Sequence, residues 1–233
     1  MKLYYFETPN ARKPCAVAKY LGAPVEFVRV DLTKREQKSP EYLAINPNGR
    51  VPALQDGNIK LWESHAIMCY LANKAGSDLW PKDDYARIDI LCWLNWDTTH
   101  FSRHAARLFF ERYIKLNFGL GEPDPKEIED ATAYYKQFAA VLDDHLKGRN
   151  AIVGDRHTVA DFGVAALLPT AKEAGLPLNG FAEACWVDGA SGLARAFSSV
   201  ARHLRGCLPP LQVPCRGARR ASASPDRSAI SAG

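Results

Sequence analysis

The pattern of apolar and polar positions changes near residue 80. Before that point, Lys2–Phe6 and Val25–Leu32 are short runs rich in β-branched and aromatic residues, which predicts two strands. Between them the apolar positions repeat at helical spacing, so we expect a helix that begins at about Pro14, or slightly earlier, and stops at Gly22. A strand, a helix and a strand in this order predict a βαβ unit with parallel strands.

A hairpin and a second helix follow this unit. Val51–Gln55 and Ile59–Leu61 are joined by Asp56-Gly57-Asn58, in which Asp-Gly favours the tight turn of an antiparallel pair. From about Glu63 the apolar positions again repeat at helical spacing until Gly76. The first part of the chain therefore predicts a βαβ-ββα unit.

Beyond a linker at about residues 78–84 the pattern is helical and carries no strand signal. Asp84–Lys115 and Pro125–Lys147 predict two long helices that pack antiparallel. A third helix begins at Thr158, which forms the aspartate version of a capping box with Asp161. The predicted fold class is thus an α/β part followed by an all-α part.

The last segment, residues 206–233, has no aromatic residue and is dominated by Pro, Ser, Ala, Gly and Arg, which predicts a dispensable, disordered tail. It holds four Arg and one Asp, so it supplies +3 of the net charge of +4. The rest of the chain is nearly neutral, which argues against a nucleic-acid partner. The sequence leaves open whether this C-terminus is native or a frameshifted or fused extension.

The overall composition is that of a globular chain, with 47% apolar and 24% charged residues. No apolar run of about 18 residues exists, and the N-terminus lacks the features of a signal peptide, so we expect a cytoplasmic protein without a membrane partner. The six cysteines show no ligand spacing, and we expect reduced thiols and no metal.

Four segments, in this order and spacing, resemble the cytosolic glutathione S-transferase family: Thr8–Lys13, Asn46–Leu54, Leu61–Ile67 and Thr158–Phe162. The resemblance implies a thioredoxin-like glutathione-binding domain over residues 1–78. It also implies an all-helical domain over residues 84–205 that contributes the electrophile pocket. The Thr8-Pro9-Asn10 form of the first motif is similar to the bacterial nu-type enzymes and their fungal nitrogen-regulator relatives.

The resemblance assigns glutathione-binding roles to six residues: Lys38, Arg50, Val51, Pro52, Glu63 and Ser64. A cis Val51–Pro52 bond would present the Val51 backbone to the cysteinyl part of glutathione. Ser64 opens a helix, where free N–H groups favour the γ-glutamyl carboxylate, and Glu63 would hold the neighbouring ammonium. Arg50 and Lys38 are candidates for the glycyl carboxylate. The alternative for Glu63 and Ser64 is a purely structural helix cap.

Thr8 and Asn10 are the candidate catalytic residues, because the reactive species is the thiolate and both can donate a hydrogen bond to it at a helix start. Lowering the thiol pKa by about two units needs roughly 2.7 kcal/mol, which one or two such bonds and a helix terminus can supply. The alternative is that Thr-Pro-Asn is only a turn. Which of the two residues dominates stays open.

The helix after residue 84 is rich in aromatic residues, and those that face the thiol would form a wall for the electrophile. We assign to this pocket Trp96, His100, Arg103 and His104. His100 and His104 also have zinc-compatible spacing, but no glutamate or cysteine partner accompanies them, and no metal is expected.

The predicted function is conjugation of the glutathione thiolate to small apolar electrophiles, with glutathione as co-substrate and no cofactor. One alternative is a glutathione-dependent disulfide-bond reductase, whose partner would be a small disulfide. Another is a non-catalytic binding or regulatory protein with the same fold. The resemblance also implies a homodimer.

Overall fold

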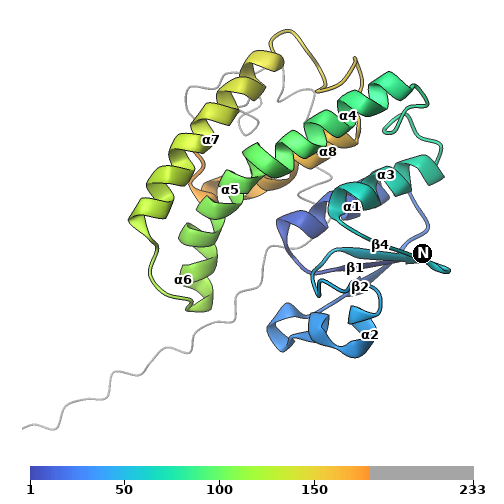
Figure 1. The fold of residues 1–233 in the computed structure, drawn as a ribbon, viewed down its shortest axis with the longest axis horizontal. Coiled ribbons are helices and arrows are strands. Elements are labelled where there is room, and N and C mark those ends of the chain that lie inside the picture. Colours follow the sequence, from blue (N-terminus) through green and yellow to red (C-terminus); the bar gives the residue numbers. More distant parts are fainter. Residues whose placement is uncertain (179–233) are drawn as a thin grey trace, which may run out of the picture.

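The computed structural model describes residues 1–178 (Figure 1). The predicted tail, residues 206–233, and the end of the predicted helical domain, residues 179–205, lie outside the described residues.

The N-terminal part is built on a four-stranded sheet with strand order β2-β1-β3-β4. Its strands are β1 (Lys2–Tyr5), β2 (Glu26–Arg29), β3 (Ala53–Asp56) and β4 (Ile59–Trp62). β1 and β2 are parallel, whereas β1 pairs antiparallel with β3, and β3 with β4. The βαβ-ββα order is confirmed.

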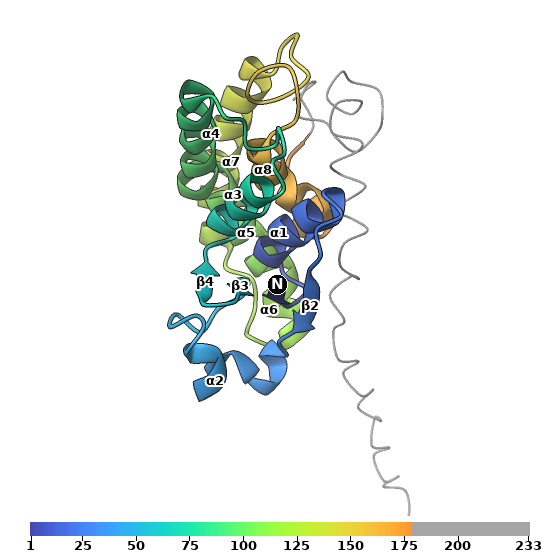
Figure 2. The same ribbon diagram turned by 90° about the vertical axis from the view of Figure 1, so that its right-hand side faces the viewer.

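Two helices, α1 (Pro9–Tyr20) and α3 (Ser64–Lys74), cover one face of the sheet and pack against each other (Figure 2). The short helix α2 (Pro40–Leu43) lies on the opposite side. Its Tyr42 is buried in a small second cluster and contacts Tyr4 edge to face, with ring centroids 5.8 Å apart. Helices therefore lie on both sides of the sheet, while the edge strands β2 and β4 stay largely exposed.

The helix α1 begins at Pro9, five residues before the predicted start at Pro14. The Thr8 side chain caps the helix, and Pro9 occupies the first turn, where a missing N–H costs little. Pro14 is consequently an interior residue and cannot donate the usual hydrogen bond to the Asn10 carbonyl. The helix start is therefore set by the capping hydrogen bond of Thr8 and by Pro9 in the first turn, and not by Pro14.

Residues between β2 and β3 form short turns that the sequence pattern does not reveal. They comprise two 3₁₀ segments, η1 (Leu32–Lys34) and η2 (Glu36–Lys38), followed by α2. Segments of three or four residues are too short to show a periodicity.

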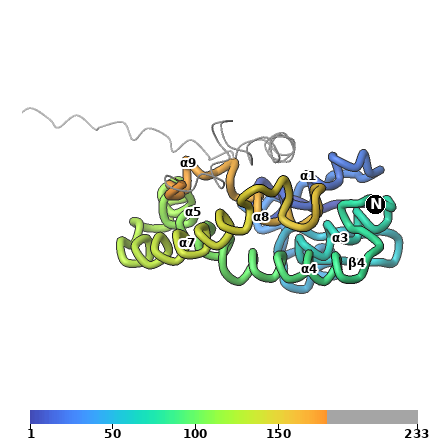
Figure 3. The backbone as a smooth tube through the Cα atoms, turned by 90° about the horizontal axis from the view of Figure 1, so that it is seen from above, coloured from blue at the N-terminus to red at the C-terminus, as the bar shows by residue number. Residues whose placement is uncertain are grey.

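The helical part contains two long antiparallel rods, formed by residues 84–118 and 125–145, and a shorter helical segment after them (Figure 3). The first rod is interrupted by two π-helical segments, and its pieces are α4 (Asp84–Trp96), η3 (Asp97–Phe101), α5 (Ser102–Phe109), η4 (Phe110–Ile114) and α6 (Lys115–Phe118). The second rod is α7 (Pro125–His145), which buries Tyr135 against the first. Both predicted long helices exist, although the π segments were not foreseen.

The third predicted helix, α8 (Val159–Val164), leads into η5 (Ala165–Thr170) and α9 (Ala171–Ala174). All of α8 is buried, and it packs against α1, α3 and α4. The predicted capping box between Thr158 and Asp161 is present. Within residues 1–178, no helix combines the length and hydropathy needed to cross a membrane.

Replacing Asp161 by alanine should lower the free energy of unfolding by about 2 to 4 kcal/mol. The buried Asp161 carboxylate accepts hydrogen bonds from the backbone N–H groups of Thr158 at 2.6 Å and of Ile152 at 2.9 Å, and both donors would lose their partner. Urea denaturation measures the change. Asp155→Ala removes an exposed aspartate from the same loop and should change stability by less than about 0.5 kcal/mol. Equal effects of the two substitutions would contradict the capping role.

Candidate functional site

A polar pocket of about 330 Å³ lies where three chain segments meet at one edge of the sheet. β1 and β4 run in the same direction, so α1 and α3 both begin at this edge, and the antiparallel β3 starts there too. The lining residues are Asn10, Asn46, Asn48, Arg50, Val51, Pro52, Glu63 and Ser64. Five of these eight were predicted to bind glutathione, and a sixth, Asn10, was predicted to be catalytic.

Thr8 and Asn10 stand at the start of α1. Thr8 is the N-cap residue, and its hydroxyl oxygen accepts a hydrogen bond from the Ala11 N–H at 3.4 Å. A hydroxyl that accepts through a lone pair keeps its own proton for donation. Asn10 is exposed and lines the pocket. Both predicted catalytic side chains thus belong to the first turn of one helix.

Glu63 and Ser64 stand at the start of α3. Ser64 is buried, whereas Glu63 is exposed and adopts φ 70° and ψ 118°, a conformation that L-residues rarely take. A strained non-glycine residue beside a pocket is a recurrent sign of function. This conformation of Glu63 turns the chain from β4 into α3. The first N–H groups of α3 have no acceptor within the helix.

The loop before β3 is held by hydrogen bonds to one carbonyl. The Arg50 C=O accepts from the Tyr42 hydroxyl and from the Asn46 side-chain amide, each at 2.7 Å. The Val51–Pro52 bond that follows is cis, as predicted. Asn46 and Asn48 were missed as lining residues, although the Asn-Pro-Asn sequence is a turn signal that could have identified them.

Lys38 lies beside the pocket but does not line it. Its ammonium donates to the Asn48 carbonyl at 3.4 Å. Gly49 has φ 57°, and an added Cβ would lie 2.9 Å from the Gln37 carbonyl oxygen. The backbone conformation and this contact both favour glycine here, and the hydrogen bond to Asn48 joins Lys38 to the loop that carries Arg50.

The four residues assigned to the electrophile pocket do not line the polar pocket at the start of α1. Trp96 stacks on Phe101, His100 on Phe138 and His104 on Tyr134, at centroid distances of 5.6, 4.7 and 4.8 Å. Arg103 lines a separate outer hollow with Phe110 and Glu127. Burial, followed by the nearby Arg107, lowers the pKa of His104, which suits a packed, neutral imidazole.

A small pocket of about 90 Å³ instead lies next to Thr8 on the helical side. Its lining residues are Glu7, Pro9, Arg12, Phe109, Tyr113, Pro169, Thr170 and Glu173. The rings of Phe109 and Tyr113 stack with centroids 5.1 Å apart. The four residues predicted from the sequence to contact the electrophile are not among those that line this pocket.

The residue before Thr8 is fixed by an ion pair to the neighbouring strand. Arg29 donates two hydrogen bonds to the buried Glu7 carboxylate, at 2.7 and 3.0 Å. Hydrogen bonding to Glu7 raises the pKa of Arg29. A two-point contact of this kind limits the freedom of the turn that carries Thr8.

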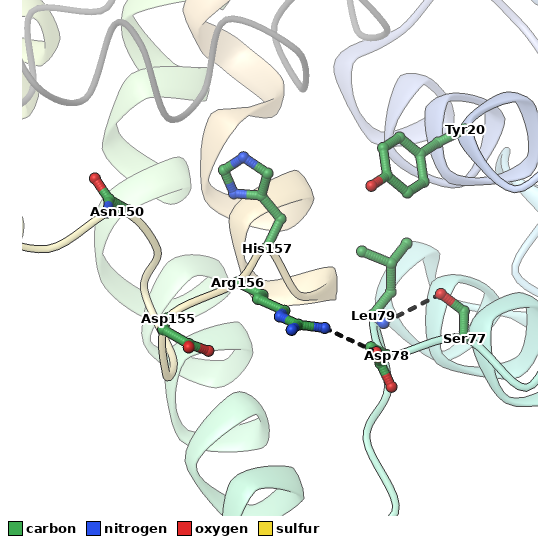
Figure 4. Close-up of a pocket in the computed structure, with 8 residues that line it drawn as sticks. All are labelled: Tyr20, Ser77, Asp78, Leu79, Asn150, Asp155, Arg156 and His157. Carbon is green, nitrogen blue, oxygen red and sulfur yellow. Dashed lines mark hydrogen bonds and ion pairs between the residues drawn. The ribbon is translucent and has the colours of Figure 1, made fainter.

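A larger pocket, of about 460 Å³, opens between the end of α1, the linker after α3 and the loop before α8 (Figure 4). Its Arg156 points to Asp78 and forms an ion pair at 3.6 Å, while Asp155 adds a further negative charge. This lining offers no surplus positive charge for a dicarboxylate ligand. Among residues 1–178, no group of three histidine, cysteine or acidic side chains is arranged to hold a metal ion.

Comparison with known proteins identifies the family. Residues 1–73 match the model of the glutathione S-transferase N-terminal domain. The chain is 35% identical to "Glutathione S-transferase 3" of Zea mays over 185 residues, which is 77% of this chain and 82% of the relative. The chain belongs to the glutathione S-transferase family.

Solved structures agree with this assignment. A structure of glutathione S-transferase III in apo form has 30% identity and a TM-score of 0.73, and the match covers 90% of this chain and 98% of the other. A glutathione transferase family member from Pseudomonas fluorescens, with two glutathione molecules bound, has 28% identity and a TM-score of 0.73, with 87% and 91% covered. The predicted fold and enzyme class, a glutathione transferase, are confirmed. The narrower resemblance to nu-type enzymes is not specifically supported by these relatives.

Proposed function

We propose that the pocket at the starts of α1 and α3 binds glutathione and that its thiolate attacks small electrophiles held next to Thr8. The observation that supports this most is the convergence of two helix N-termini on one polar pocket. Such termini favour anions, and glutathione carries two carboxylates and a thiolate.

The charges of glutathione match the groups around the pocket. Ser64 and the first N–H groups of α3 bind the γ-glutamyl carboxylate, and Glu63 binds the neighbouring ammonium. Arg50 binds the glycyl carboxylate, with Lys38 adding positive charge from outside the lining. The Val51 backbone pairs with the cysteinyl residue in the manner of an added strand. This arrangement directs the thiol towards the start of α1.

Thr8 and Asn10 stabilise the thiolate. Each donates a hydrogen bond that is stronger to the anion than to the thiol, and the start of α1 adds a favourable dipole. The thiolate sulfur forms a bond to the electrophilic carbon, and the leaving group departs with the electron pair of the broken bond. Phe109 and Tyr113, which line the pocket beside Thr8, form an apolar wall for the electrophile. Cys15, the cysteine of α1, is buried in the core and takes no part in this step.

With glutathione, the protein should turn over a model aryl halide faster than a small disulfide, because the pocket beside Thr8 has an aromatic wall. Two parallel spectrophotometric assays measure this. Turnover of the disulfide alone would instead indicate a glutathione-dependent disulfide reductase. Glutathione binding without turnover of either substrate would indicate a binding or regulatory protein.

In a Thr8→Ala, Asn10→Ala double variant, the pKa of bound glutathione should rise by about 1 to 2 pH units while binding changes little. Turnover at neutral pH should fall, and the deficit should shrink as the pH rises, since hydroxide then generates the thiolate. The ultraviolet absorbance of the bound thiolate, titrated against pH, reports the pKa. Thr33→Ala, Asn58→Ala removes the same chemical groups from exposed positions and serves as the control. Coinciding curves for the active-site variant and the wild type would mean that Thr8 and Asn10 only form a turn.

We further propose a cytoplasmic homodimer that uses the outer face of α4. This face exposes Tyr85, Ile88 and Leu91, with exposed fractions of 84%, 63% and 45%. An apolar stripe of this kind on one helix is typical of an interaction surface.

Light scattering should therefore report twice the mass of one chain at micromolar concentration. Ile88→Glu should produce monomers, because it places a charge in the apolar contact. Val141→Glu, which changes an exposed apolar residue on α7, should leave the dimer intact. A monomeric wild type would refute the proposal.

A further inference from the structure

A cluster of buried charged and polar side chains lies beneath the proposed glutathione pocket, at the contact between the two parts of the chain. The Lys13 ammonium of α1 forms an ion pair with Asp97 at 3.1 Å and a hydrogen bond with His65 Nε2 of α3 at 3.0 Å. Only 4% of the Lys13 side chain and none of the Asp97 side chain is exposed. Ser102 donates to the second Asp97 oxygen at 2.5 Å.

The hydrogen bonds of the cluster are mutually consistent when His65 is neutral. Lys13 donates to His65 Nε2, so Nδ1 carries the proton and faces the Thr98 hydroxyl at 3.3 Å. Thr98 in turn donates to the Leu94 carbonyl at 3.1 Å. In this state the cluster contains one cation and one anion, and its net charge is zero.

Electrostatics favour the same state. Burial lowers the pKa of His65, and the neighbouring Lys13 ammonium lowers it further, against the opposing influence of Asp97 and Glu63. Burial alone would raise the pKa of Asp97, but the neighbouring Lys13 ammonium, together with the Ser102 hydrogen bond, holds it below its ordinary value. The remaining neighbour of His65 is α8, which approaches with Gly163, where an added Cβ would lie 2.9 Å from Leu94 and 3.3 Å from the His65 ring.

The position of the cluster relates it to the pocket. Lys13 lies one turn beyond Asn10 on α1, and His65 directly follows Ser64 on α3. Asp97 is the first residue of the π segment η3 and belongs to the helical part. A single carboxylate therefore contacts both helices whose starts form the proposed glutathione site.

We propose that Lys13 is a positioning residue for glutathione binding. Through its contacts with Asp97 and His65, Lys13 holds the starts of α1 and α3 at a fixed distance from each other and against the helical part. This inference rests on the proposed function of the pocket. Lys13 does not itself line that pocket, so its effect is transmitted through the helices.

The experiment measures glutathione affinity by calorimetry and the titration of His65 by NMR between about pH 5 and 8. The His65 resonance is assigned from its absence in His65→Gln. The test variants are Lys13→Met and the double variant Lys13→Met, Asp97→Asn. The matched control is Lys74→Met. It removes an exposed lysine at the far end of α3 that forms an ion pair with Asp56 of β3. Ser64→Ala is the reference for direct loss of a glutathione contact.

In Lys13→Met, the Kd for glutathione should rise about tenfold or more, and the His65 pKa should rise by at least about one pH unit, because Asp97 then acquires a proton-bearing partner in His65. Glutathione affinity should become pH-dependent over the new His65 range. In the double variant the imidazole should return to neutral, while affinity stays low because the link between the helices is still missing. Lys74→Met should behave as the wild type.

Two results would overturn the proposal: wild-type affinity in a folded Lys13→Met protein, or an unchanged His65 titration in it. If Lys13→Met does not fold, the double variant decides, and wild-type affinity there has the same meaning. Failure of the wild type to bind glutathione would overturn the proposed function and this inference together. Weak binding by Ser64→Ala with normal binding by both Lys13 variants would overturn this inference alone.

Discussion

The directions of the strands are the constraint on which the rest of the structure depends. Since β1 and β4 point the same way and β3 points back between them, α1, α3 and the Arg50–Pro52 segment all meet at one edge of the sheet. The order of the elements alone therefore produces a pocket with two helix N-termini facing it. Side chains refine this environment, but the backbone creates most of its preference for anions.

The second requirement is that the sheet-containing part and the helical part keep a fixed relative position. Most of their contact is apolar, and apolar contacts tolerate small sliding motions because they have little directionality. The Lys13–Asp97 pair differs, since a buried ion pair is favourable only at good geometry and is costly when broken. Gly163 also helps to fix this relative position, because the absence of a side chain lets α8 lie close to His65 and Leu94.

Sequence reasoning succeeded where a short motif carries its own local physics. The cap at Thr158 and Asp161 and the start of α3 near Glu63 and Ser64 are each specified by neighbouring residues, whereas the cis Val51–Pro52 bond was implied by the family resemblance. It failed where the outcome depends on distant contacts. Pro14 favoured a late start for α1, and no pattern along the chain indicated that Lys13 would form an ion pair with Asp97, which lies 84 residues away.

The wall of the electrophile pocket depends on how the first helical rod faces the N-terminal part. Trp96, His100 and His104 contact other aromatic rings of the helical part, while Phe109 and Tyr113 line the pocket beside Thr8. Aromatic residues occur along the whole rod, so composition alone does not distinguish those that face this pocket from those of the core. No pattern of residue types indicated the π segments that interrupt the rod.

The π segments also separate the length of this rod from the direction of its later side chains. A π segment closes its turn with hydrogen bonds from residue i to residue i+5, so it holds one residue more than an α-helical turn. Deleting one residue after Asp97 in this segment would let the turn become α-helical, and Phe109 and Tyr113 would keep nearly the same direction about the rod axis. The same deletion within the regular helix α5 would instead rotate every later side chain by about 100°. Relatives with a length change in a π segment would thus keep the wall beside Thr8, whereas relatives with a length change in α5 would present a different wall to the second substrate above the same glutathione pocket.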